Sequence, residues 1–251
     1  MNAFEFVYIV FTLLLFAYLA RHYVFTIAVL RAARKPKTCD ASCFGNFEPS
    51  VAILIPAHNE AKVIGRLLER TTQLAYPKDK LQIVVVDDAS SDTTGEISDQ
   101  YANSFPFIKV IHRTEGGKGK SSAMNIGFKN STGEIVLCLD ADYYPQIDMV
   151  SKLVRLFADT AVGAVQGRVV VLNEPQNMVT RLVALERIGG YRVDQQARED
   201  LMLIPQFGGT VGGFRRDLLE RIGGWDESIL AEDTDLTFRI RLGGYRVRYA
   251  G

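Results

Sequence analysis

Acidic residues follow apolar runs at two points in the sequence and open a helical pattern at a third, and this arrangement strongly constrains the fold. Asp87-Asp88 follows the apolar run 81–86, and Asp140-Ala141-Asp142 follows the run 135–139. The pair Glu232-Asp233 begins a later helical pattern. Short runs rich in Val, Ile and Leu are typical of buried strands in a parallel sheet. Because ligands of open α/β sheets bind where such strands end, we expect these carboxylates to share a site that holds a divalent metal and a diphosphate.

Strand and helix patterns alternate along the chain from residue 51. The spacing predicts strands over 51–55, 81–86, 107–111, 134–139, 162–172 and 245–249, and helices over 60–74, 119–129, 146–157 and 230–241. Asn59 is a candidate N-cap for the first of these helices, and Thr93-x-x-Glu96 has the spacing of a capping box for a further helix. Short connections between alternating elements are typical of a doubly wound, mostly parallel α/β sheet with flanking helices.

The N-terminal segment has the composition of a membrane anchor. Residues 6–30 carry only Arg21-His22 as an interruption, and as one helix they would span roughly 37 Å at ~1.5 Å per residue. Glu5 and the lack of a small-residue cleavage pattern disfavour a signal peptide. Four basic residues follow this segment: Arg31, Arg34, Lys35 and Lys37. By the positive-inside rule they place the rest of the chain in the cytoplasm. A long amphipathic or core helix is the alternative.

These patterns predict three parts: a transmembrane helix over 1–34, a linker over 35–49 and an α/β domain over 50–251. The protein would be single-pass in the inner cell membrane, with its α/β domain cytoplasmic. The sequence stops directly after a predicted strand, so we expect it to be a fragment of a longer protein.

Composition and motifs exclude several classes of function. A formal net charge of zero gives no overall basic field for nucleic acid. Cys39 and Cys43 without a partnering His make a poor zinc site, and Cys138 within an apolar run is expected to be a small buried hydrophobe. The segment 116–121 fails the P-loop pattern because Thr114 stands where that pattern needs Gly. Lys120, at a loop-to-helix junction, can still meet a diphosphate.

Each acidic cluster could have a structural role instead of a chemical one. Asp88 could bind a nucleoside or, like Asp87 and Asp92, cap a turn. Asp140 and Asp142, with no Lys or Arg beside them in the sequence, could hold Mg²⁺ or Mn²⁺ or form a surface turn.

The third cluster has the same two alternatives. Asp233 could be a general base that takes a proton from an acceptor hydroxyl. Glu232-Asp233 could instead only support a helix N-terminus, where acidic residues are favoured by the helix dipole.

Together the motifs resemble the family 2 glycosyltransferases, and more narrowly the membrane-bound processive β-glycan synthases. The matching segments, in order along the chain, are 56–60 (PAHNE), 86–92 (VDDASSD), Gly119-Lys120 with Asn125 and Gly127, 138–142 (CLDAD), 209–214 (GTVGGF), 223–226 (GGWD) and 231–237 (AEDTDLT). The resemblance implies a GT-A-type sheet, a UDP-sugar donor and inversion at the anomeric carbon.

The resemblance also implies roles for individual residues. Glu60 and Asp88 would contact uridine and Lys120 the diphosphate, Asp140 and Asp142 would hold the nucleotide and the metal, and Asp233 would be the base. Pro56, Ala57 and Glu232 would complete the substrate-binding set.

The function that follows is metal-assisted transfer from a UDP-sugar onto a growing β-linked polysaccharide at the membrane. The alternatives are transfer of a single sugar to a polyprenyl-phosphate lipid and an inactive, truncated sugar-nucleotide-binding module. The Gln/Arg-x-x-Arg-Trp segment of these synthases is absent from the sequence, whose single Trp is Trp225. We expect that segment to follow Gly251 in a longer chain.

Overall fold

The computed structural model describes residues 2–34, 47–116 and 119–251. These residues form two compact units. One comprises Met1–Asp40, Val169–Pro205 and Gly251, and the other comprises Ala41–Arg168 and Gln206–Ala250. Most of the linker predicted over 35–49, including Cys39 and Cys43 as well as the basic Lys35 and Lys37, lies outside the described residues.

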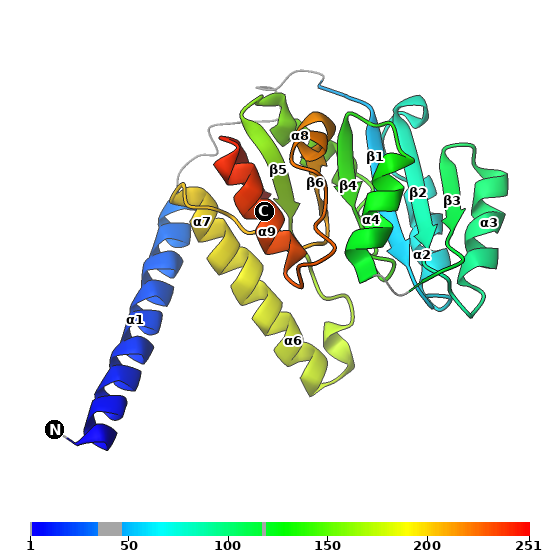
Figure 1. Ribbon diagram of the computed structural model, residues 1–251. Coiled ribbons are helices and arrows are strands. Elements are labelled where there is room, and N and C mark those ends of the chain that lie inside the picture. The colour runs from blue at the N-terminus through cyan, green and yellow to red at the C-terminus, as the bar shows by residue number, and fades with distance from the viewer. Residues whose placement is uncertain (1, 35–46, 117–118) are drawn as a thin grey trace. The chain divides into compact units, whose positions relative to one another are not determined.

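The larger unit is built on one mixed sheet of seven strands in the order β3-β2-β1-β4-β6-β5-β7 (Figure 1). The strands β1, β2, β3 and β4 are parallel, β6 is antiparallel to both β4 and β5, and β7 is parallel to β5. The predicted GT-A-like α/β sheet is confirmed. The strands are β1 (Val51–Ala57), β2 (Leu81–Asp87), β3 (Ile108–His112), β4 (Ile135–Cys138), β5 (Val162–Gly167), β6 (Gly212–Arg215) and β7 (Arg246–Ala250).

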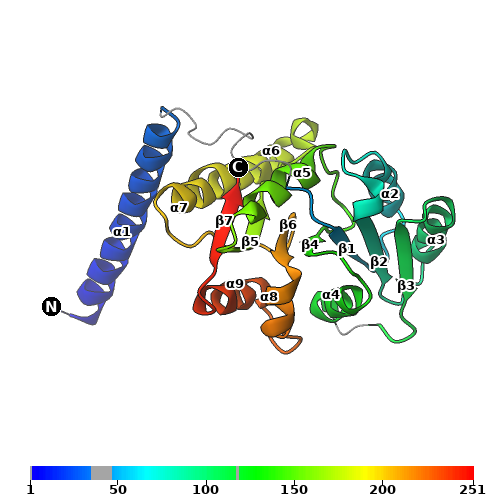
Figure 2. The ribbon, with the colours of Figure 1, turned by 90° about the horizontal axis from the view of Figure 1, so that it is seen from above.

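Helices cover both faces of this sheet. Figure 2 shows α4, α8 and α9 on one face and α2, α3 and α5 on the other. This follows from right-handed crossovers, because the chain moves outward from β1 to β3 and then returns through α4 to β4 on the other side of β1. These helices are α2 (Ile64–Thr72), α3 (Thr94–Ser104), α4 (Gly119–Lys129), α5 (Met149–Val154), α8 (Arg216–Arg221) and α9 (Glu232–Leu242), with short 3₁₀ turns at Lys78–Lys80 and Arg155–Ala158.

The core beneath α4, α8 and α9 is aromatic. Phe214 of β6 lies 4.5 Å from Phe207 and 5.7 Å from Trp225 between ring centroids, and Trp225 meets Phe128 of α4 edge-on. All four side chains are at most 8% exposed. Edge-to-face pairs of this kind add to the stabilisation that burial itself provides.

One predicted helix start is wrong, and one predicted capping box does not form although its helix starts directly after Thr93. Asn59 is not an N-cap: its backbone has φ 56°, its side-chain oxygen accepts a hydrogen bond from the Ser91 amide at 2.8 Å, and α2 starts only at Ile64. The Thr93 capping box does not form either. Asp92 instead accepts from the Thr94 amide at 3.0 Å and from the Ala61 amide at 3.1 Å, so the capping side chain is the preceding Asp.

Two later elements are shorter than predicted. The β-branched run 162–172 forms a strand only to Gly167, because the chain from Val169 onward belongs to the other unit. The helix predicted over 146–157 consists of α5 from Met149 and a following 3₁₀ turn.

The smaller unit contains one long helix and a second helical segment. The long helix, α1 (Ala3–Ala32), starts with a capping box between Asn2 and Glu5 and is apolar and long enough to cross a membrane. The second segment runs without a break through α6 (Met178–Ile188), the π-helical η5 (Gly189–Gln195) and α7 (Gln196–Asp200), after a 3₁₀ turn at Glu174–Gln176.

Candidate active site

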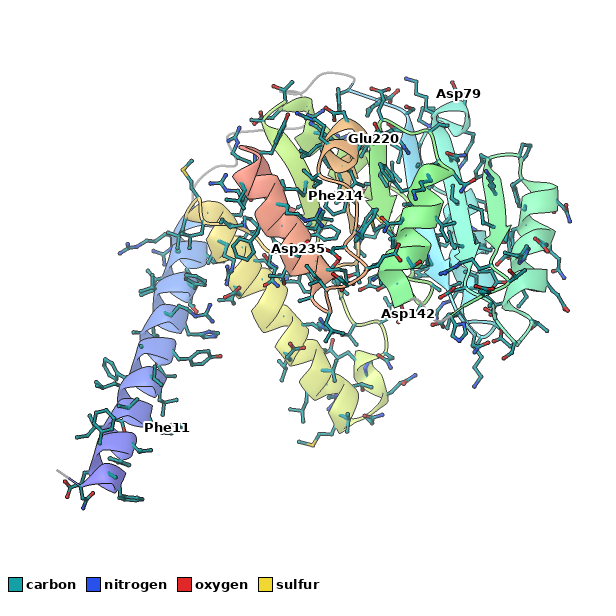
Figure 3. The ribbon with its side chains drawn as sticks, in the orientation of Figure 1. Phe11, Asp79, Asp142, Phe214, Glu220 and Asp235 are labelled. Atoms are coloured by element: carbon teal, nitrogen blue, oxygen red, sulfur yellow. The ribbon has the colours of Figure 1, made fainter. Side chains whose placement is uncertain are left out.

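The carboxyl ends of three adjacent parallel strands bring the predicted site residues to one edge of the sheet. β1 lies between β2 and β4, and the Asp88 amide donates to the Ala57 carbonyl at 2.8 Å. Connections leave β1 in one direction and return at β4 on the other side, which is the switch point where ligands of open α/β sheets bind. Asp142, labelled in Figure 3, lies beyond the end of β4 at this edge.

The loops after β1 and β2 hold each other in place. Pro56 and Ala57 are in register with Val86 and Asp87 of β2. The Glu60 amide donates to the Thr94 hydroxyl at 2.8 Å, and the Asn59 amide donates to the Ser90 hydroxyl at 3.0 Å. These contacts place Pro56, Ala57 and Glu60 at the same edge as Asp88.

Asp88 is buried in an ion pair that the sequence analysis missed. Its Oδ1 lies 2.6 Å from Nη1 of Arg113, and the two side chains are 11% and 9% exposed. Arg113 directly follows β3, so its position after the third parallel strand was the available signal. The charge of Asp88 is therefore neutralised within the protein, and Arg113 joins the candidate nucleoside region.

Asp87 has a structural role instead. It accepts from the Ser90 amide at 3.1 Å and lies 3.0 Å from Nδ1 of His112, whose Nε2 lies 3.0 Å from Asp99. Burial opposes the charge of Asp87, but its hydrogen bonds to Ser90 and His112 lower its pKa overall. The same bonds to Asp87 and Asp99 raise the pKa of His112.

Lys120, at the start of α4, contacts the first Asp of the Asp-x-Asp pair. Its Nζ lies 2.5 Å from Oδ1 of Asp140 and donates to the Gly209 carbonyl at 2.8 Å. No Lys or Arg is adjacent to this pair in the sequence, but the fold brings Lys120 against Asp140. Burial disfavours the charge of Lys120, yet the adjacent carboxylates of Asp140 and Asp233 raise its pKa.

Asp233 lies in the first turn of α9 with its carboxylate against Gly209. A Cβ added to Gly209 would fall 2.1 Å from Oδ2 of Asp233, and Gly209 has φ +71°. Burial first, and then repulsion from Glu232 and Asp140, raise the pKa of Asp233 to about 6, while Lys120 opposes the shift. The N-cap position of α9 is occupied by Ala231, so Asp233 is not the capping residue.

A buried hydrogen-bond network holds the Gly209 segment in front of α9. The Gln166 side chain accepts from the Gly208 amide at 2.7 Å and donates to the Thr210 carbonyl at 2.9 Å. The Thr237 hydroxyl accepts from the Phe207 amide at 3.1 Å and donates to the Asp233 carbonyl at 2.8 Å. The sequence analysis did not predict a role for Gln166. Its amide side chain inside the β-branched run 162–172 was the available signal of a buried hydrogen-bonding role.

The glycine pairs have packing and turn roles. A Cβ at Gly213 would fall 2.4 Å from the Leu137 side chain, so Gly212-Gly213 lets β6 lie close to its neighbours. Gly223 and Gly224 form a turn at positive φ.

The carboxylates at this edge suit a divalent cation. Burial raises the pKa of Glu60, and repulsion from Asp142, Asp92 and Asp140 raises it further. Burial also raises the pKa of Asp140. Asp142 and Glu232 add to this shift, while Lys120 opposes it. Excess negative charge of this kind is relieved by a cation. Within the described residues no three His, Cys, Asp or Glu side chains are grouped closely enough to hold an ion alone. Mg²⁺, however, usually takes one or two carboxylates and completes its shell with water and phosphate oxygens, so Asp140 and Asp142 fit that ion with a diphosphate.

This sheet, with acidic side chains at its switch point and the half-buried Asp233 carboxylate near them, is typical of glycosyltransferases with a nucleotide-sugar-binding fold. The sequence pattern of Glycosyl transferase family 2 matches residues 52–223, and the chain belongs to this family. The predicted family and enzyme class are confirmed. The narrower assignment to processive synthases and the roles of the individual site residues stay predictions.

Two relatives describe the family context. The chain is 42% identical over 204 residues to "Probable glycosyltransferase YdaM" of Bacillus subtilis, covering 80% of this chain and 49% of the relative. It is 35% identical over 201 residues to a "Beta-monoglucosyldiacylglycerol synthase" of Synechocystis sp., covering 79% and 42%. The chain thus spans about half the length of these relatives.

Among solved structures, the fold matches the mannosyltransferase PcManGT from Pyrobaculum calidifontis in complex with GDP-Man and Mn²⁺. The TM-score is 0.73 at 31% identity, with 93% of this chain and 64% of that chain covered.

Proposed function

We propose that this glycosyltransferase transfers a sugar from a UDP-sugar to an acceptor hydroxyl with inversion, and that Asp233 is the general base. The observation that carries the proposal is the half-buried Asp233 carboxylate, which lies against Gly209 near Lys120 and Asp140 and has its pKa raised to about 6. A carboxyl with this pKa is ionised at neutral pH and is a better proton acceptor than an ordinary Asp.

The donor would bind along the switch-point edge. Pro56, Ala57, Glu60 and Asp88 with Arg113 would form the nucleoside end, because they surround the ends of β1, β2 and β3. Lys120 would exchange its contact with Asp140 for the diphosphate, and Asp140 and Asp142 would hold Mg²⁺ or Mn²⁺. When bound, the ion supplies positive charge that stabilises the departing diphosphate. The Mn²⁺ and nucleotide sugar named for the Pyrobaculum structure support this arrangement.

A hydroxyl acceptor fits the site better than a phosphate acceptor. A hydroxyl must lose a proton during attack, whereas a polyprenyl phosphate is already ionised and needs little help from a base. A diacylglycerol hydroxyl is the acceptor favoured by the relative named for monoglucosyldiacylglycerol. The hydroxyl of a β-linked polysaccharide, predicted from the sequence, is the second candidate. We further propose that α1 anchors the chain in the membrane, where a lipid acceptor would lie.

The substitution Asp233→Asn tests the base. Turnover should fall about 10²–10⁴-fold, while donor affinity stays nearly unchanged, because the base acts on the acceptor. The wild-type rate should fall as pH decreases through about 6, since protonated Asp233 cannot accept a proton, and this limb should vanish in the variant. Steady-state rates between pH 5 and 8, with diacylglycerol vesicles, an oligosaccharide and polyprenyl phosphate offered separately, measure both effects.

Asp235→Asn is the matched control. Asp235 lies in the same first turn of α9 but pairs with Arg239 at 2.7 Å, so its loss removes an N-terminal acid without touching the site. Its turnover should stay close to that of the wild type. Full activity of Asp233→Asn would remove the base assignment and would favour transfer to a lipid phosphate.

A further inference from the structure

Exposure along α1 divides the helix into two parts. Every described residue from position 3 to 20 is exposed, whereas burial begins at Arg21 and Phe25 is only 8% exposed. The exposed part is mostly apolar and carries no charged residue except Glu5 near its start, and Phe11 projects from it (Figure 3). Its 18 residues would measure about 27 Å at ~1.5 Å per residue, close to the ~30 Å hydrocarbon core of a bilayer.

Arg21 marks the end of this exposed part and is held by the second helical segment. Its Nη1 lies 2.6 Å from Oδ1 of Asp194 in η5, and its guanidinium packs over the rings of Tyr18 and Phe25. Arg198 of α7 binds the other oxygen of Asp194 at 2.7 Å. Charged side chains are strongly disfavoured in hydrocarbon, so this three-residue cluster belongs at the membrane boundary.

The helix α6 leaves this cluster with an unpartnered apolar face. From η5 it runs toward the same side of the unit as the N-terminal end of α1 (Figure 1). Met178, Leu182 and Leu185 share one face at helical spacing and are 75%, 55% and 63% exposed. Beside them, Val179 and Val183 are exposed too. Contiguous exposed apolar side chains of this extent mark an interaction surface.

We propose that α6 lies in the boundary between lipid headgroups and acyl chains, with Met178, Leu182 and Leu185 directed into the bilayer. The occupant is lipid because the Arg21–Asp194 pair fixes the start of the segment at the depth where the exposed part of α1 ends. The inference rests on the proposed membrane anchoring by α1 and adds a second membrane contact, about 160 residues further along the chain.

Tryptophan scanning in vesicles tests this contact with the full chain. Leu185→Trp places a reporter on the apolar face, and Arg187→Trp places one on the other side of the same helix, where Arg187 is 52% exposed. The native Trp225 is 4% exposed and gives the background signal of the unsubstituted chain. Vesicles of phosphatidylcholine and phosphatidylglycerol with brominated acyl chains quench only reporters that enter the bilayer.

We expect emission from Leu185→Trp to be blue-shifted and quenched several times more strongly than that from Arg187→Trp, with Met178→Trp behaving like Leu185→Trp. If the protein floats with the vesicles but bromine does not quench the Leu185→Trp reporter, α1 anchors the chain and the α6 inference is wrong. A blue shift without quenching would also overturn it and would indicate a protein partner, such as a second copy. Failure to float would overturn the anchoring by α1 itself.

Discussion

At the scale of single residues, the position of the Asp233 carboxylate depends on the absence of a side chain at Gly209. The carbonyl of Gly209 accepts from Lys120, and its Cα lies against Asp233, so this glycine touches both charges that face Asp140. The positive φ of +71° adds a second reason for glycine at this position. Gly209 is therefore a positioning residue of the proposed base.

Gly209→Ala should lower turnover by about 10²-fold, because a displacement of the base by about 1 Å is enough for such a loss. Gly244→Ala is the matched control, since Gly244 has φ +84° but nothing within 4 Å of an added Cβ. Both variants should lose about 1–2 kcal/mol of stability from left-handed backbone. Thermal melts and rates measured side by side would contradict the assignment if the two variants lost activity equally.

Nucleotide binding should depend on a divalent ion and on Asp142. Burial first, and then neighbouring carboxylates, raise the pKa of Glu60 and Asp140, and these carboxylates would repel a diphosphate unless a cation is present. Calorimetry of UDP and of GDP, each with and without Mg²⁺ or Mn²⁺, should show ion-dependent binding that prefers UDP and weakens in Asp142→Asn. Asp148→Asn, which removes only a surface pair with Lys152, is the control. Equal affinity with and without the ion would exclude the metal assignment.

At the scale of elements, α4 supports the site from two directions. Its first turn presents Lys120, and its middle fixes the turn before α9 through Asn125. The Asn125 side chain donates to the Trp225 carbonyl at 2.8 Å and accepts from the Trp225 amide at 3.0 Å. A Cβ at Gly224 would fall 2.7 Å from this side-chain oxygen. The contact between Asn125 and the turn thus gives a structural reason for two of the motifs that resemble family 2, Asn125 itself and the segment 223–226.

Asn125→Ala should cost about 1–3 kcal/mol, because it leaves backbone groups of Trp225 without their partner. Turnover should fall less than in Asp233→Asn, since the site is loosened and no reacting group is lost. Asn130→Ala should be close to neutral, because this exposed side chain makes only a bond to the Ile126 carbonyl and a long surface contact with Lys109. Urea unfolding followed by Trp225 fluorescence measures both, and equal midpoints for the two variants would rule out the anchoring role.

Sequence patterns predicted the parallel strands and α4 well. A run of β-branched residues indicates a buried strand, and a glycine before a helical pattern indicates a helix start, and both can be recognised from neighbouring residues alone. The bounds of α4 match at both ends. The start of α2 was wrong because Asn59 takes a positive φ to bind Ser91, a contact made by another loop. The pairs Lys120–Asp140 and Arg113–Asp88 were missed for the same reason, since only the folded sheet brings the partners together.

At the scale of the whole molecule, zero net charge conceals a strongly uneven distribution. The N-terminal helix carries Glu5 near its start and Arg31 at its end, and the sequence continues with Arg34, Lys35 and Lys37. The proposed site gathers carboxylates in the larger unit, which suits a cation and a diphosphate. The charge pattern thus agrees with the proposal that a membrane-anchored enzyme takes a nucleotide sugar from the cytoplasm.

This topology predicts that the chain resists extraction by alkaline carbonate and that its larger unit is protected from protease added to the outside of right-side-out cells. The apolar α1 is the reason for the carbonate resistance. The reason for the protease protection is the basic cluster after α1, which the positive-inside rule retains on the cytoplasmic side. Inverted vesicles, in which the cytoplasmic face is outward, are the control and should expose the unit to digestion. If carbonate released the protein, α1 would be an ordinary helix of a soluble or peripheral protein. If protease digested the unit in intact cells, the anchor would be correct but its orientation reversed, and a cytoplasmic UDP-sugar could no longer be the donor.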